Sequence, residues 1–386
     1  MTRVLLVPDL RLERWPSMDR YASRLSSYLQ HDPDFAIDVA TPISTLTETQ
    51  VQRSTPASTR HARTPDGGSM IGELRRYVAR YWSYPRRVGR RPTDLMHILD
   101  HSYAHVLRAH RDVPVVITVH DLMPVKIVQQ RAKGFRDLLR NRLLESVLVA
   151  LRQASAWIVA TEWLRDELSA WLGHAERISV IPYGVDDAFF EPPELSRSAA
   201  RERWDIDPAA FVVLHVGSVV SRKNFTAVIA AVDGLRQSGV NAWLLQFGAA
   251  LNSGQQADIA QRQLGDFVRA RGASVESDLR AAYRTADVLL FPSHYEGFGL
   301  PVLEAMASGL PVVTSGAGGL GEVAADAALI VGGREVEPYV SALADLAGDG
   351  ERRRELAAKG IKRAEAFRWA ETARQTAELY RQLTSA

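Results

Sequence analysis

The feature that most restricts the fold of this chain is an alternation between short apolar runs and segments long enough to form a helix. The apolar runs lie at residues 4–7, 37–40, 96–99, 115–119, 157–160 and 178–181, and then at 212–216, 243–247, 288–291, 312–314 and 329–331. Such runs, separated by helix-length segments, are typical of buried parallel strands joined by crossover helices. The sequence therefore predicts an α/β protein with parallel sheets.

The series of apolar runs is interrupted by Asp186-Asp-Ala-Phe-Phe-Glu-Pro-Pro193 and then starts again. We therefore predict two Rossmann-like domains, at residues 1–190 and 191–363. Residues 364–386 are predicted to form a closing C-terminal helix, because apolar residues recur there at helical spacing: Phe367, Trp369, Ala373, Leu379 and Tyr380. Residues 45–70 are rich in Ser, Thr, Arg and Gly without a clear period, and they are predicted to form a loop.

Length and composition narrow the class of protein. The 386 residues suffice for two domains, and the absence of cysteine excludes a disulfide framework, a thiolate metal site and a cysteine nucleophile. The net charge of +2 gives little support for nucleic-acid binding. No stretch approaches the roughly 20 apolar residues of a membrane span, and the first residues are typical of a strand instead of a signal peptide. We expect a cytoplasmic protein.

One strand-turn-helix segment gives the strongest indication of function. An apolar run is followed by Ser-His-Tyr-Glu-Gly-Phe-Gly-Leu-Pro-Val-Leu-Glu at residues 293–304, and Pro301 and Gly309 are typical first-turn and stop residues of a helix. This order places two carboxylates, Glu296 and Glu304, on either side of a glycine-containing turn.

The turn is predicted to bind a nucleotide sugar. Its backbone N–H groups at Phe298, Gly299 and Leu300 would be free at a helix N-terminus, and an anion is the ligand favoured there. Because carboxylates would repel an anion, Glu296 and Glu304 are expected to bind neutral hydroxyls beside it. Phosphate and hydroxyl groups together describe a nucleotide sugar.

A second candidate site follows the strand that ends at Val216. The sequence continues Gly217-Ser-Val-Val-Ser-Arg-Lys-Asn224, which places Arg222 and Lys223 at the start of the next helical segment. In doubly wound sheets, ligands bind outside the carboxyl ends of the strands, where two cations could neutralise a diphosphate. The structural alternative, a solvated pair of cations without a ligand, is common for such dipeptides.

Together these motifs resemble those of the family 4 glycosyltransferases, which have the GT-B fold, and the resemblance covers nearly the whole chain. The turn with Glu296 and Glu304 resembles the family's two-glutamate donor motif, and Arg222-Lys223-Asn224 resembles its phosphate-binding motif. Further similar stretches are Pro182-Tyr-Gly-Val-Asp186, before the interdomain linker; Leu320-Gly-Glu322, a donor-side loop; and residues 367–380, the C-terminal helix that crosses back to the first domain.

The resemblance implies two Rossmann-like domains facing an interdomain cleft, and a retaining, metal-independent transfer of a hexose from a nucleotide-diphosphate donor. Glu296 would hold sugar hydroxyls and Glu304 ribose hydroxyls, while Arg222 and Lys223 would stabilise the leaving diphosphate. The remaining donor contacts are expected at Gly217, Ser218, Gly297, Phe298, Gly299 and Leu300. The leaving phosphate would take the proton of the acceptor, so neither a separate base nor a cofactor besides the donor substrate is expected.

His120 and Asp121 follow the apolar run 115–119 and should lie at a strand's carboxyl end in the first domain. On position alone, His120 could equally hydrogen-bond a loop while Asp121 caps the next segment. The resemblance implies that His120 lies near the sugar and is the catalytic residue of the first domain. Four nearby residues could line the acceptor side or be structural: His97, Asp100, His101 and Tyr103.

The segment after the first strand departs from the family pattern. Family members commonly have a glycine-rich loop there, where the backbone approaches the donor phosphate, but Leu12–Tyr21 contains no glycine. Either Ser17 and neighbouring N–H groups make this contact, or the first domain handles donor and acceptor differently.

Two other motifs point more weakly to different functions. Gly316-Ala-Gly-Gly-Leu-Gly321 matches the dinucleotide-binding pattern, but residues 322–328 are too few for a parallel crossover before the next apolar run, which argues against a nicotinamide site. The pairs Asp32-Pro-Asp34 and Asp205-Ile-Asp207 precede strands, where Asp and Pro form turns, so no metal site is predicted.

Residues 75–91 form a strongly basic segment, in which seven arginines are interleaved with Tyr77, Tyr81, Trp82 and Tyr84 and no acidic residue occurs. This pattern suits contact with an anionic membrane surface or with an acceptor carried on a lipid diphosphate. The alternative is a partly packed helix with a solvated face.

We therefore predict a retaining glycosyltransferase of polysaccharide, glycolipid or other glycoconjugate assembly, with a glycan, lipid-linked or small-molecule acceptor. The Arg-Lys-Asn motif resembles members that use GDP-mannose, so mannosyl transfer is the first expectation and a UDP-linked sugar the next; residues 271–275 are expected near the base. Two alternatives are a sugar-nucleotide-binding partner protein without transfer activity and a GT-B-type epimerase, against which the glutamate and Arg-Lys motifs argue.

Overall fold

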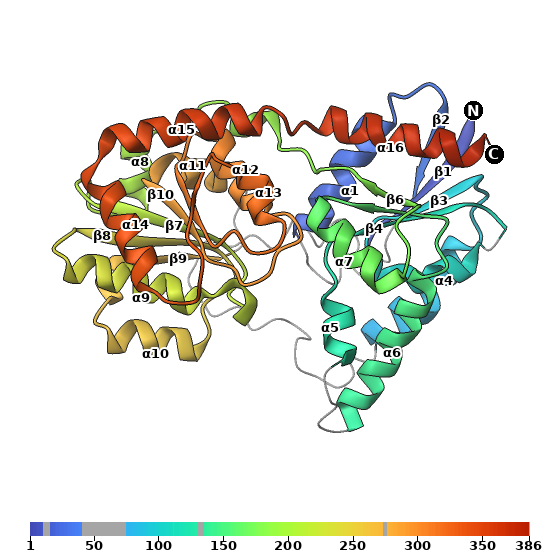
Figure 1. The fold of residues 1–386 in the computed structure, drawn as a ribbon, viewed down its shortest axis with the longest axis horizontal. Helices are drawn as coiled ribbons and strands as arrows, with labels where there is room; N and C mark the ends of the chain where they lie inside the picture. The colour runs from blue at the N-terminus through green and yellow to red at the C-terminus, as the bar shows by residue number, and fades with distance from the viewer. Residues whose placement is uncertain (11–15, 41–74, 111, 130–134, 273–275, 386) are drawn as a thin grey trace. The chain divides into compact units, whose positions relative to one another are not determined.

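The structure, a computed structural model, describes residues 1–10, 16–40, 75–110, 112–129, 135–272 and 276–385. The chain forms two compact units. The first comprises Met1–Val159, Arg165–Ile181 and Ala373–Ala386, and the second comprises Ala160–Leu164 and Pro182–Thr372. Each unit is built on a parallel sheet (Figure 1). The loop expected at residues 45–70 lies outside the described part of the chain.

The sheet of the first unit has, among the described residues, six parallel strands in the order β2-β1-β3-β4-β5-β6. The strands are β1 (Thr2–Val7), β2 (Phe35–Val39), β3 (Leu95–Ile98), β4 (Val115–Val119), β5 (Ala156–Val159) and β6 (Ile178–Val180). All of them coincide with predicted apolar runs, apart from small shifts at their ends. The order changes direction between β1 and β3, and sheets of this class bind ligands at such switch points.

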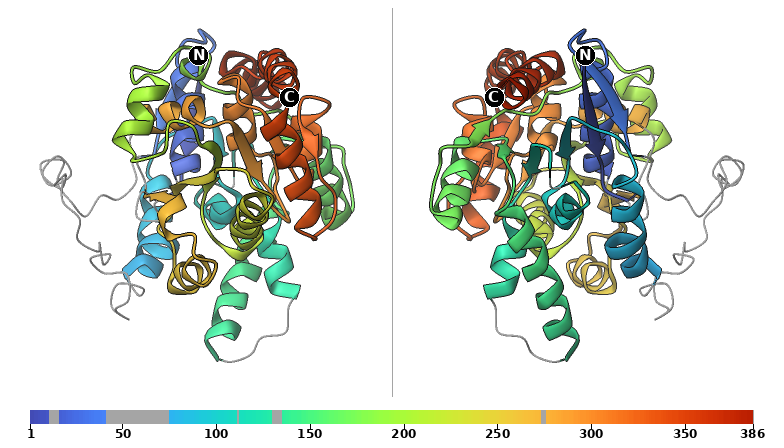
Figure 2. Two further views of the ribbon diagram at one scale, coloured as in Figure 1. Left: turned by 90° about the vertical axis from the view of Figure 1, so that its left-hand side faces the viewer. Right: turned by 90° about the vertical axis from the view of Figure 1, so that its right-hand side faces the viewer.

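The helices of the same part of the chain are α1 (Pro16–Leu29), η2 (Ala79–Ser83), α4 (Tyr84–Val88), η3 (His101–Ala109), α5 (Met123–Gln129), α6 (Phe135–Leu151) and α7 (Glu162–Leu172). Helices α5 and α6 lie side by side in all views (Figures 1 and 2). Residues 16–21, part of the predicted glycine-free loop, instead begin α1, because Pro16 suits a first helical turn and Asp19 suits a helix N-terminus. Residues 11–15 of that loop are not among those described.

The sheet of the second unit has, within the described ranges, six parallel strands in the order β12-β11-β10-β7-β8-β9. They are β7 (Phe211–Gly217), β8 (Ala242–Gly248), β9 (Val268–Arg271), β10 (Val288–Phe291), β11 (Val312–Thr314) and β12 (Leu329–Ile330). This is the strand order of a dinucleotide-binding fold, with its switch point between β7 and β10. Arg271, which begins the stretch expected near the nucleotide base, ends the edge strand β9, and residues 273–275 of that stretch are not among those described.

The helices of the second unit are η4 (Asp187–Phe189), α8 (Arg197–Arg203), η5 (Ser221–Lys223), α9 (Phe225–Gln237), α10 (Ser253–Gln261), η6 (Gly265–Phe267), α11 (Glu276–Thr285), α12 (Leu300–Ala307), α13 (Leu320–Ala324), α14 (Glu337–Gly348) and α15 (Gly350–Ala364). Helix α9 contributes Phe225, Val228 and Val232 to a core that also contains Val213 and Leu244 of the sheet. This core fixes the ends of β7 and β8, which carry the loops considered below.

The connection from β11 to β12 contradicts the prediction made for it. The two strands are parallel, with Val313 opposite Leu329, and α13 forms the crossover between them. The connection includes the glycine run itself, so residues 315–328 are available to form it. The prediction was wrong because it counted the residues after the glycines alone.

Helix α16 (Trp369–Thr384) ends the described chain, and its residues from Ala373 onward belong to the first unit (Figure 1). Tyr380 is completely buried, its hydroxyl lies 2.5 Å from His97 Nδ1, and its ring packs edge-on against Phe35. The return of the C-terminal helix to the first unit is therefore confirmed. The helix begins later than predicted, because the residues before Trp369 belong to α15 and a short turn.

Candidate donor site

Three of the residues predicted to bind the donor come together at the switch point of the second sheet. Arg222 and Lys223 lie in η5, shortly after β7, and Glu296 lies in the loop between β10 and α12. Because β7 and β10 are neighbouring parallel strands, their carboxyl ends lie at the same edge of the sheet. The His294 N–H donates to the Arg222 carbonyl at 2.8 Å and joins the two loops.

The side chains at the switch point form an ion-pair group. Lys223 Nζ lies 2.5 Å from Glu296 Oε1, and Arg222 Nη1 lies 3.5 Å from Glu296 Oε2. Lys223 and Glu296 are buried, whereas 33% of the Arg222 side chain is exposed. Lys223 Nζ also lies 4.9 Å from the centre of the Phe291 ring, a favourable cation–π distance. Two cations share one carboxylate, which leaves net positive charge where a diphosphate is expected.

The turn before α12 has a left-handed residue, Gly299, at the N-cap of the helix. Gly299 has φ +107°, and a Cβ at this position would lie 2.4 Å from a side-chain carbon of Leu320. In the described part of the chain, no group accepts a hydrogen bond from the N–H of Phe298, Gly299 or Leu300. These N–H groups are therefore available to an anion. Gly309, with φ +70°, follows the other end of α12, as predicted.

Glu304 lies within α12 and is 4% exposed. Its Oε2 accepts a hydrogen bond of 2.7 Å from the hydroxyl of Tyr283, a buried residue of α11. This bond fixes the orientation of a carboxylate that is predicted to bind ribose hydroxyls. The sequence gives no sign of Tyr283, because one aromatic residue in an amphipathic helix is explained equally well by core packing.

The glycine run 316–321 packs against the Glu296 turn. The Gly319 N–H donates to the Glu296 carbonyl at 2.8 Å, and a Cβ on Gly318 would lie 2.3 Å from that carbonyl oxygen. The Gly297 carbonyl, in turn, accepts a hydrogen bond of 3.0 Å from Thr161 Oγ1. The glycines thus permit a close approach of two backbone segments. This packing explains why glycines recur at residues 316–321 without requiring a dinucleotide site.

Glu322, part of the predicted donor-side loop, caps a helix in this structure. Its carboxylate accepts hydrogen bonds from the N–H groups of Glu162 at 2.8 Å and Trp163 at 2.5 Å. These N–H groups begin α7, in the part of that helix that belongs to the second unit. The Trp163 ring packs edge-on against Tyr295, beside the Glu296 turn. Negative charge is favoured at a helix N-terminus, so Glu322 has a structural role that the sequence did not indicate.

The loop after β7 begins at Gly217, which has φ +137°, and continues through Ser218. Gln246 on β8 is the register partner of His215 and donates from Nε2 to the carbonyls of Gly217 at 3.5 Å and Ala249 at 3.1 Å. Gln246 and His215 are completely buried. Gln246 lies within a predicted apolar strand, so the support that it gives to the loop is not evident from the sequence.

In the first unit, His120 follows β4 and lies in a group of polar and aromatic side chains. Its Nε2 lies 2.7 Å from the Leu99 carbonyl, and its ring packs edge-on against Tyr21. Burial lowers the pKa of His120 below its ordinary value. Asp121 Oδ1 accepts the Met123 N–H at 2.9 Å at the start of α5. Both structural roles considered for His120 and Asp121 are therefore present.

The four other residues considered for the acceptor side are buried: His97, Asp100, His101 and Tyr103. Burial lowers the pKa of His97 to about 3, so its imidazole is neutral. The Tyr103 hydroxyl accepts the Leu10 N–H at 3.2 Å, and His101 Nδ1 lies 3.5 Å from Asp100 Oδ1. These side chains connect the loops after β1 and β3, and their burial opposes the expectation that they line an acceptor site.

Of the four aspartates considered as metal ligands, three form ion pairs, and Asp207 accepts hydrogen bonds from the Ala209 N–H and the Asn241 amide. Asp32 and Asp34 lie 2.6 Å and 2.8 Å from Arg381 of α16, and Asp205 lies 2.7 Å from Arg269. Within the described ranges, no three His, Asp or Glu side chains come together as a metal site would need.

Two family models match most of the chain. The model described as Glycosyltransferase Family 4 matches residues 18–189, and that described as Glycosyl transferases group 1 matches residues 196–363. The D-inositol 3-phosphate glycosyltransferase of Paenarthrobacter aurescens is 32% identical over 282 residues, covering 71% of this chain and 68% of that protein. The protein of the same name from Segniliparus rotundus is 31% identical over 269 residues, covering 68% of this chain and 59% of that protein. The chain thus spans less than two thirds of the Segniliparus relative.

Solved structures show the same fold at low sequence identity. Sucrose-phosphate synthase from Thermosynechococcus elongatus has a TM-score of 0.74 at 22% identity over the whole of both chains. Anabaena HepE in complex with UDP and glucose has a TM-score of 0.73 at 19% identity, covering 99% of this chain and 100% of that chain. WaaG, a glycosyltransferase involved in lipopolysaccharide biosynthesis, has a TM-score of 0.71 at 20% identity with the same coverage. The chain belongs to the family 4 glycosyltransferases and has their GT-B fold.

Proposed function

We propose that the chain is a retaining, metal-independent glycosyltransferase that moves a hexose from a nucleotide-diphosphate sugar to an acceptor hydroxyl. The observation that carries this proposal is the group of Arg222, Lys223 and Glu296 at the switch point, beside the free N–H groups that begin α12. Cations and N–H groups suit the diphosphate, and carboxylates suit the hydroxyls of the sugar and ribose.

In this mechanism, Lys223, Arg222 and the N–H groups of the turn hold the donor diphosphate. Negative charge grows on the phosphate as the bond between the anomeric carbon and the phosphate oxygen breaks, and one such fixed donor contributes about 3 kcal/mol in comparable sites. Glu296 binds sugar hydroxyls and opposes the positive charge that develops on the ring. The acceptor hydroxyl attacks from the face that the phosphate leaves, and its proton passes to the leaving phosphate oxygen.

Glu304 and His120 are given supporting roles in the proposal. Glu304 binds the ribose hydroxyls, with its carboxylate held by Tyr283. His120 contacts the sugar from the first domain as a neutral hydrogen-bonding group, since its lowered pKa disfavours the imidazolium near pH 7. His120→Ala should therefore lower kcat more than it lowers the affinity for the donor.

Testing a small set of candidate compounds can identify the donor and the acceptor. The Arg-Lys-Asn motif resembles that of members that use GDP-mannose, whereas solved complexes of HepE contain UDP, glucose or UDP-glucose. A thermal-shift panel of GDP-, UDP-, dTDP- and ADP-sugars should therefore show stabilisation by one base class. We propose D-inositol 3-phosphate as the first acceptor to test, because the relatives above are named for it.

The same panel, followed by turnover assays, separates an enzyme from a nucleotide-sugar-binding partner protein. Stabilisation by a donor together with release of the nucleoside diphosphate supports the transferase. Stabilisation without release, with every acceptor tried, supports the binding protein. If no nucleotide sugar stabilises the chain, both proposals are contradicted.

We also propose that the basic segment at residues 75–91 contacts an anionic membrane surface. The backbone of the segment is helical from Arg75 to Val88. The Trp82 side chain is 63% exposed and the Tyr77 side chain 45% exposed. Five arginines are exposed beside them: Arg75, Arg76, Arg86, Arg87 and Arg90. The buried Tyr84 attaches the segment to the unit through a 2.6 Å hydrogen bond to the Pro8 carbonyl. Among the described residues, no helix is long and apolar enough to cross a membrane.

Co-sedimentation with vesicles tests this contact. Binding to anionic vesicles should weaken as salt rises, and it should weaken in Trp82→Ala and in Arg86→Ala, because interfacial aromatics and arginines act together at a lipid headgroup surface. Equal binding to neutral and anionic vesicles, or no binding to either, contradicts the proposal.

A further inference from the structure

The second unit contains a cavity of about 440 Å³, and its lining includes Tyr283, whose hydroxyl donates to Glu304 of the candidate donor site. It is lined by residues that precede β10 and β11, by the start of α8 and by the first turns of α15. Residues before parallel strands lie at the amino edge of a sheet, whereas Lys223 and Glu296 lie at the carboxyl edge. A ligand in this cavity would therefore be distinct from the bound donor.

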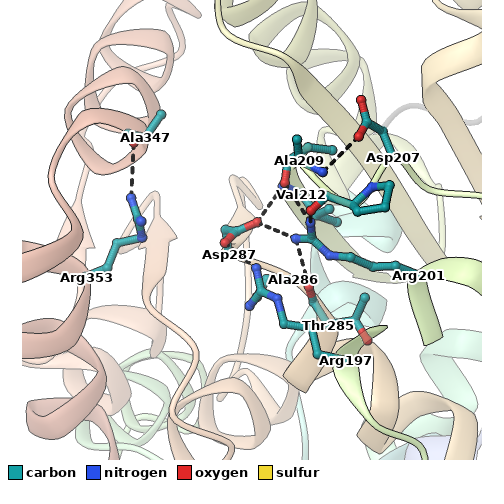
Figure 3. Close-up of polar contacts among 12 residues, drawn as sticks. Arg197, Arg201, Asp207, Ala209, Val212, Thr285, Ala286, Asp287, Ala347 and Arg353 are labelled. Atoms are coloured by element: carbon teal, nitrogen blue, oxygen red, sulfur yellow. Dashed lines mark hydrogen bonds and ion pairs between the residues drawn. The ribbon is translucent and has the colours of Figure 1, made fainter. Parts of the chain in front are cut away.

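The charged residues of the cavity lining are mostly basic: Arg197, Arg284, Arg353, Arg354 and Asp287. The carboxylate of Asp287 lies 2.6 Å from Arg197 through Oδ1 and 2.9 Å from Arg201 through Oδ2 (Figure 3). Oδ2 also accepts the Val212 N–H at 2.8 Å. The single negative charge of Asp287 is thus shared by Arg197 and Arg201. It does not balance the charges of the other arginines of the lining.

Two of these arginines are held in place by neutral carbonyl groups. Arg284 Nη2 donates to the Phe190 carbonyl at 3.1 Å. Arg353 Nη1 donates to the Ala347 carbonyl at 3.2 Å, as Figure 3 shows. A carbonyl accepts a hydrogen bond but does not neutralise a guanidinium. Burial lowers the pKa of Arg284, and the nearby charge of Arg280 lowers it further, as expected where cations are crowded.

Arg354 lies at the edge of this basic cavity and is exposed. Within the described ranges, no side chain or carbonyl forms an ion pair or hydrogen bond with its guanidinium. Its five N–H donors are therefore available to a ligand. The fork of a guanidinium matches two oxygens of a phosphate, and arginine is common where phosphate groups are bound.

We propose that this cavity binds a phosphate-bearing anion, either inorganic phosphate or the phosphate group of a soluble metabolite. Its volume lies within the range of small-molecule sites. Arg197, Arg284 and Arg353 provide a fixed basic wall, and Arg354 contacts the phosphate directly. The bound anion balances positive charge that the surrounding residues leave uncompensated.

Calorimetric titration of the full chain with inorganic phosphate and with glucose 6-phosphate tests this site. The informative variant is Arg354→Glu, and its matched control is Arg352→Glu, which changes an exposed arginine of the same helix that does not line the cavity. We expect Arg354→Glu to weaken binding at least tenfold and Arg352→Glu to change it less than twofold. Melting temperatures of both variants should equal that of the wild type, since neither side chain is buried.

The outcomes separate the sources of the anion and the two sites. Tighter binding of glucose 6-phosphate indicates a metabolite, and equal binding of both probes indicates inorganic phosphate. If phosphate binds only at Lys223, the two variants should change its affinity equally. Such an equal effect overturns the proposal, and so does the absence of binding by either probe. Because the probes are not donors, the test does not depend on transfer activity.

Discussion

At the scale of single residues, the contact between Lys223 and Glu296 explains how a carboxylate can lie where a diphosphate is expected. The ammonium group is 2.5 Å from the carboxylate, and both residues are buried. Removal of Lys223 would leave the buried Glu296 carboxylate with only its 3.5 Å contact to Arg222, and breaking a buried ion pair in this way costs about 3 kcal/mol.

Lys223→Met should therefore lower the free energy of unfolding by about 3 kcal/mol, because the buried Glu296 loses its 2.5 Å partner and keeps only the 3.5 Å contact with Arg222. The double variant Lys223→Met/Glu296→Gln removes both charges and should recover most of that loss. Urea unfolding of the three proteins gives the comparison. Equal stability of the wild type and Lys223→Met would show that the pair is not formed in solution.

His215 allows a second prediction. Its two ring nitrogens have no hydrogen-bond partner among the described residues, and its ring packs beside Phe225 and Phe291. Burial lowers the pKa of His215 to about 3. The unfolded chain takes up a proton near pH 6.5 and the folded chain does not, so stability falls by about 2 kcal/mol for this residue as the pH falls from 7 to 5.

In His215→Phe this loss should be absent, because phenylalanine does not titrate and fits among the same aromatic neighbours. We expect the free energy of unfolding of His215→Phe to fall by about 2 kcal/mol less than that of the wild type between pH 7 and pH 5. His31→Phe, at an exposed position, is the control and should keep the wild-type pH dependence. A variant that loses as much stability as the wild type would contradict the burial of a neutral His215.

The sequence identifies the main residues of the donor site but not their contacts. Glu296, Glu304 and Lys223 are recognisable because they border glycine-containing turns after apolar strands. The Lys223–Glu296 pair joins positions 73 residues apart and depends on the pairing of β7 with β10, which local sequence does not encode. Tyr283 lies inside an ordinary helical pattern, so nothing local distinguishes it.

At the scale of elements, the turn before α12 depends on Gly299. The positive φ disfavours any side chain, and the space that a Cβ would need is occupied by Leu320.

Gly299→Ala should lower the free energy of unfolding by about 2 kcal/mol and abolish the thermal shift caused by the donor, because the N–H groups of the turn move. Gly265→Ala is the control: a Cβ at Gly265 meets no atom within 4 Å, and its φ is not positive. Urea unfolding and the thermal-shift panel report both effects. A normal donor shift in Gly299→Ala would show that the turn does not hold the donor.

Strand β9 and the start of helix α1 were not predicted from the sequence, because the first lacks the continuous apolar run of a central strand and the second was compared with a family loop. Strand β9 lies at a sheet edge, where Val268-Arg-Ala-Arg271 is half-exposed and lacks the apolar run of a central strand. The start of α1 was predicted as a loop by analogy with a glycine-rich loop of the family, although Pro16 and Asp19 suit a helix start. Central strands were predicted well because burial on both faces requires continuous apolar sequence.

At the scale of the whole molecule, the predicted division into two α/β halves is recovered as two parallel sheets with different strand orders. The two compact units are not continuous in sequence, because packing contacts decide which unit a segment belongs to. Residues 160–164 belong to the second unit because Thr161 and the first turn of α7 contact the Glu296 turn and Glu322. Such long-range contacts leave no periodic signal in the sequence.

The central claim is that the switch-point site of the second unit turns over a nucleotide-diphosphate sugar, and the most direct measurement is nucleoside-diphosphate release in the presence of donor and acceptor. The wild type should release it from at least one donor of the panel, and Lys223→Met/Glu296→Gln should be slower by at least 100-fold, since a lost phosphate donor in comparable sites costs about 10²–10³ in rate. A double variant that releases nucleoside diphosphate as fast as the wild type would contradict the account.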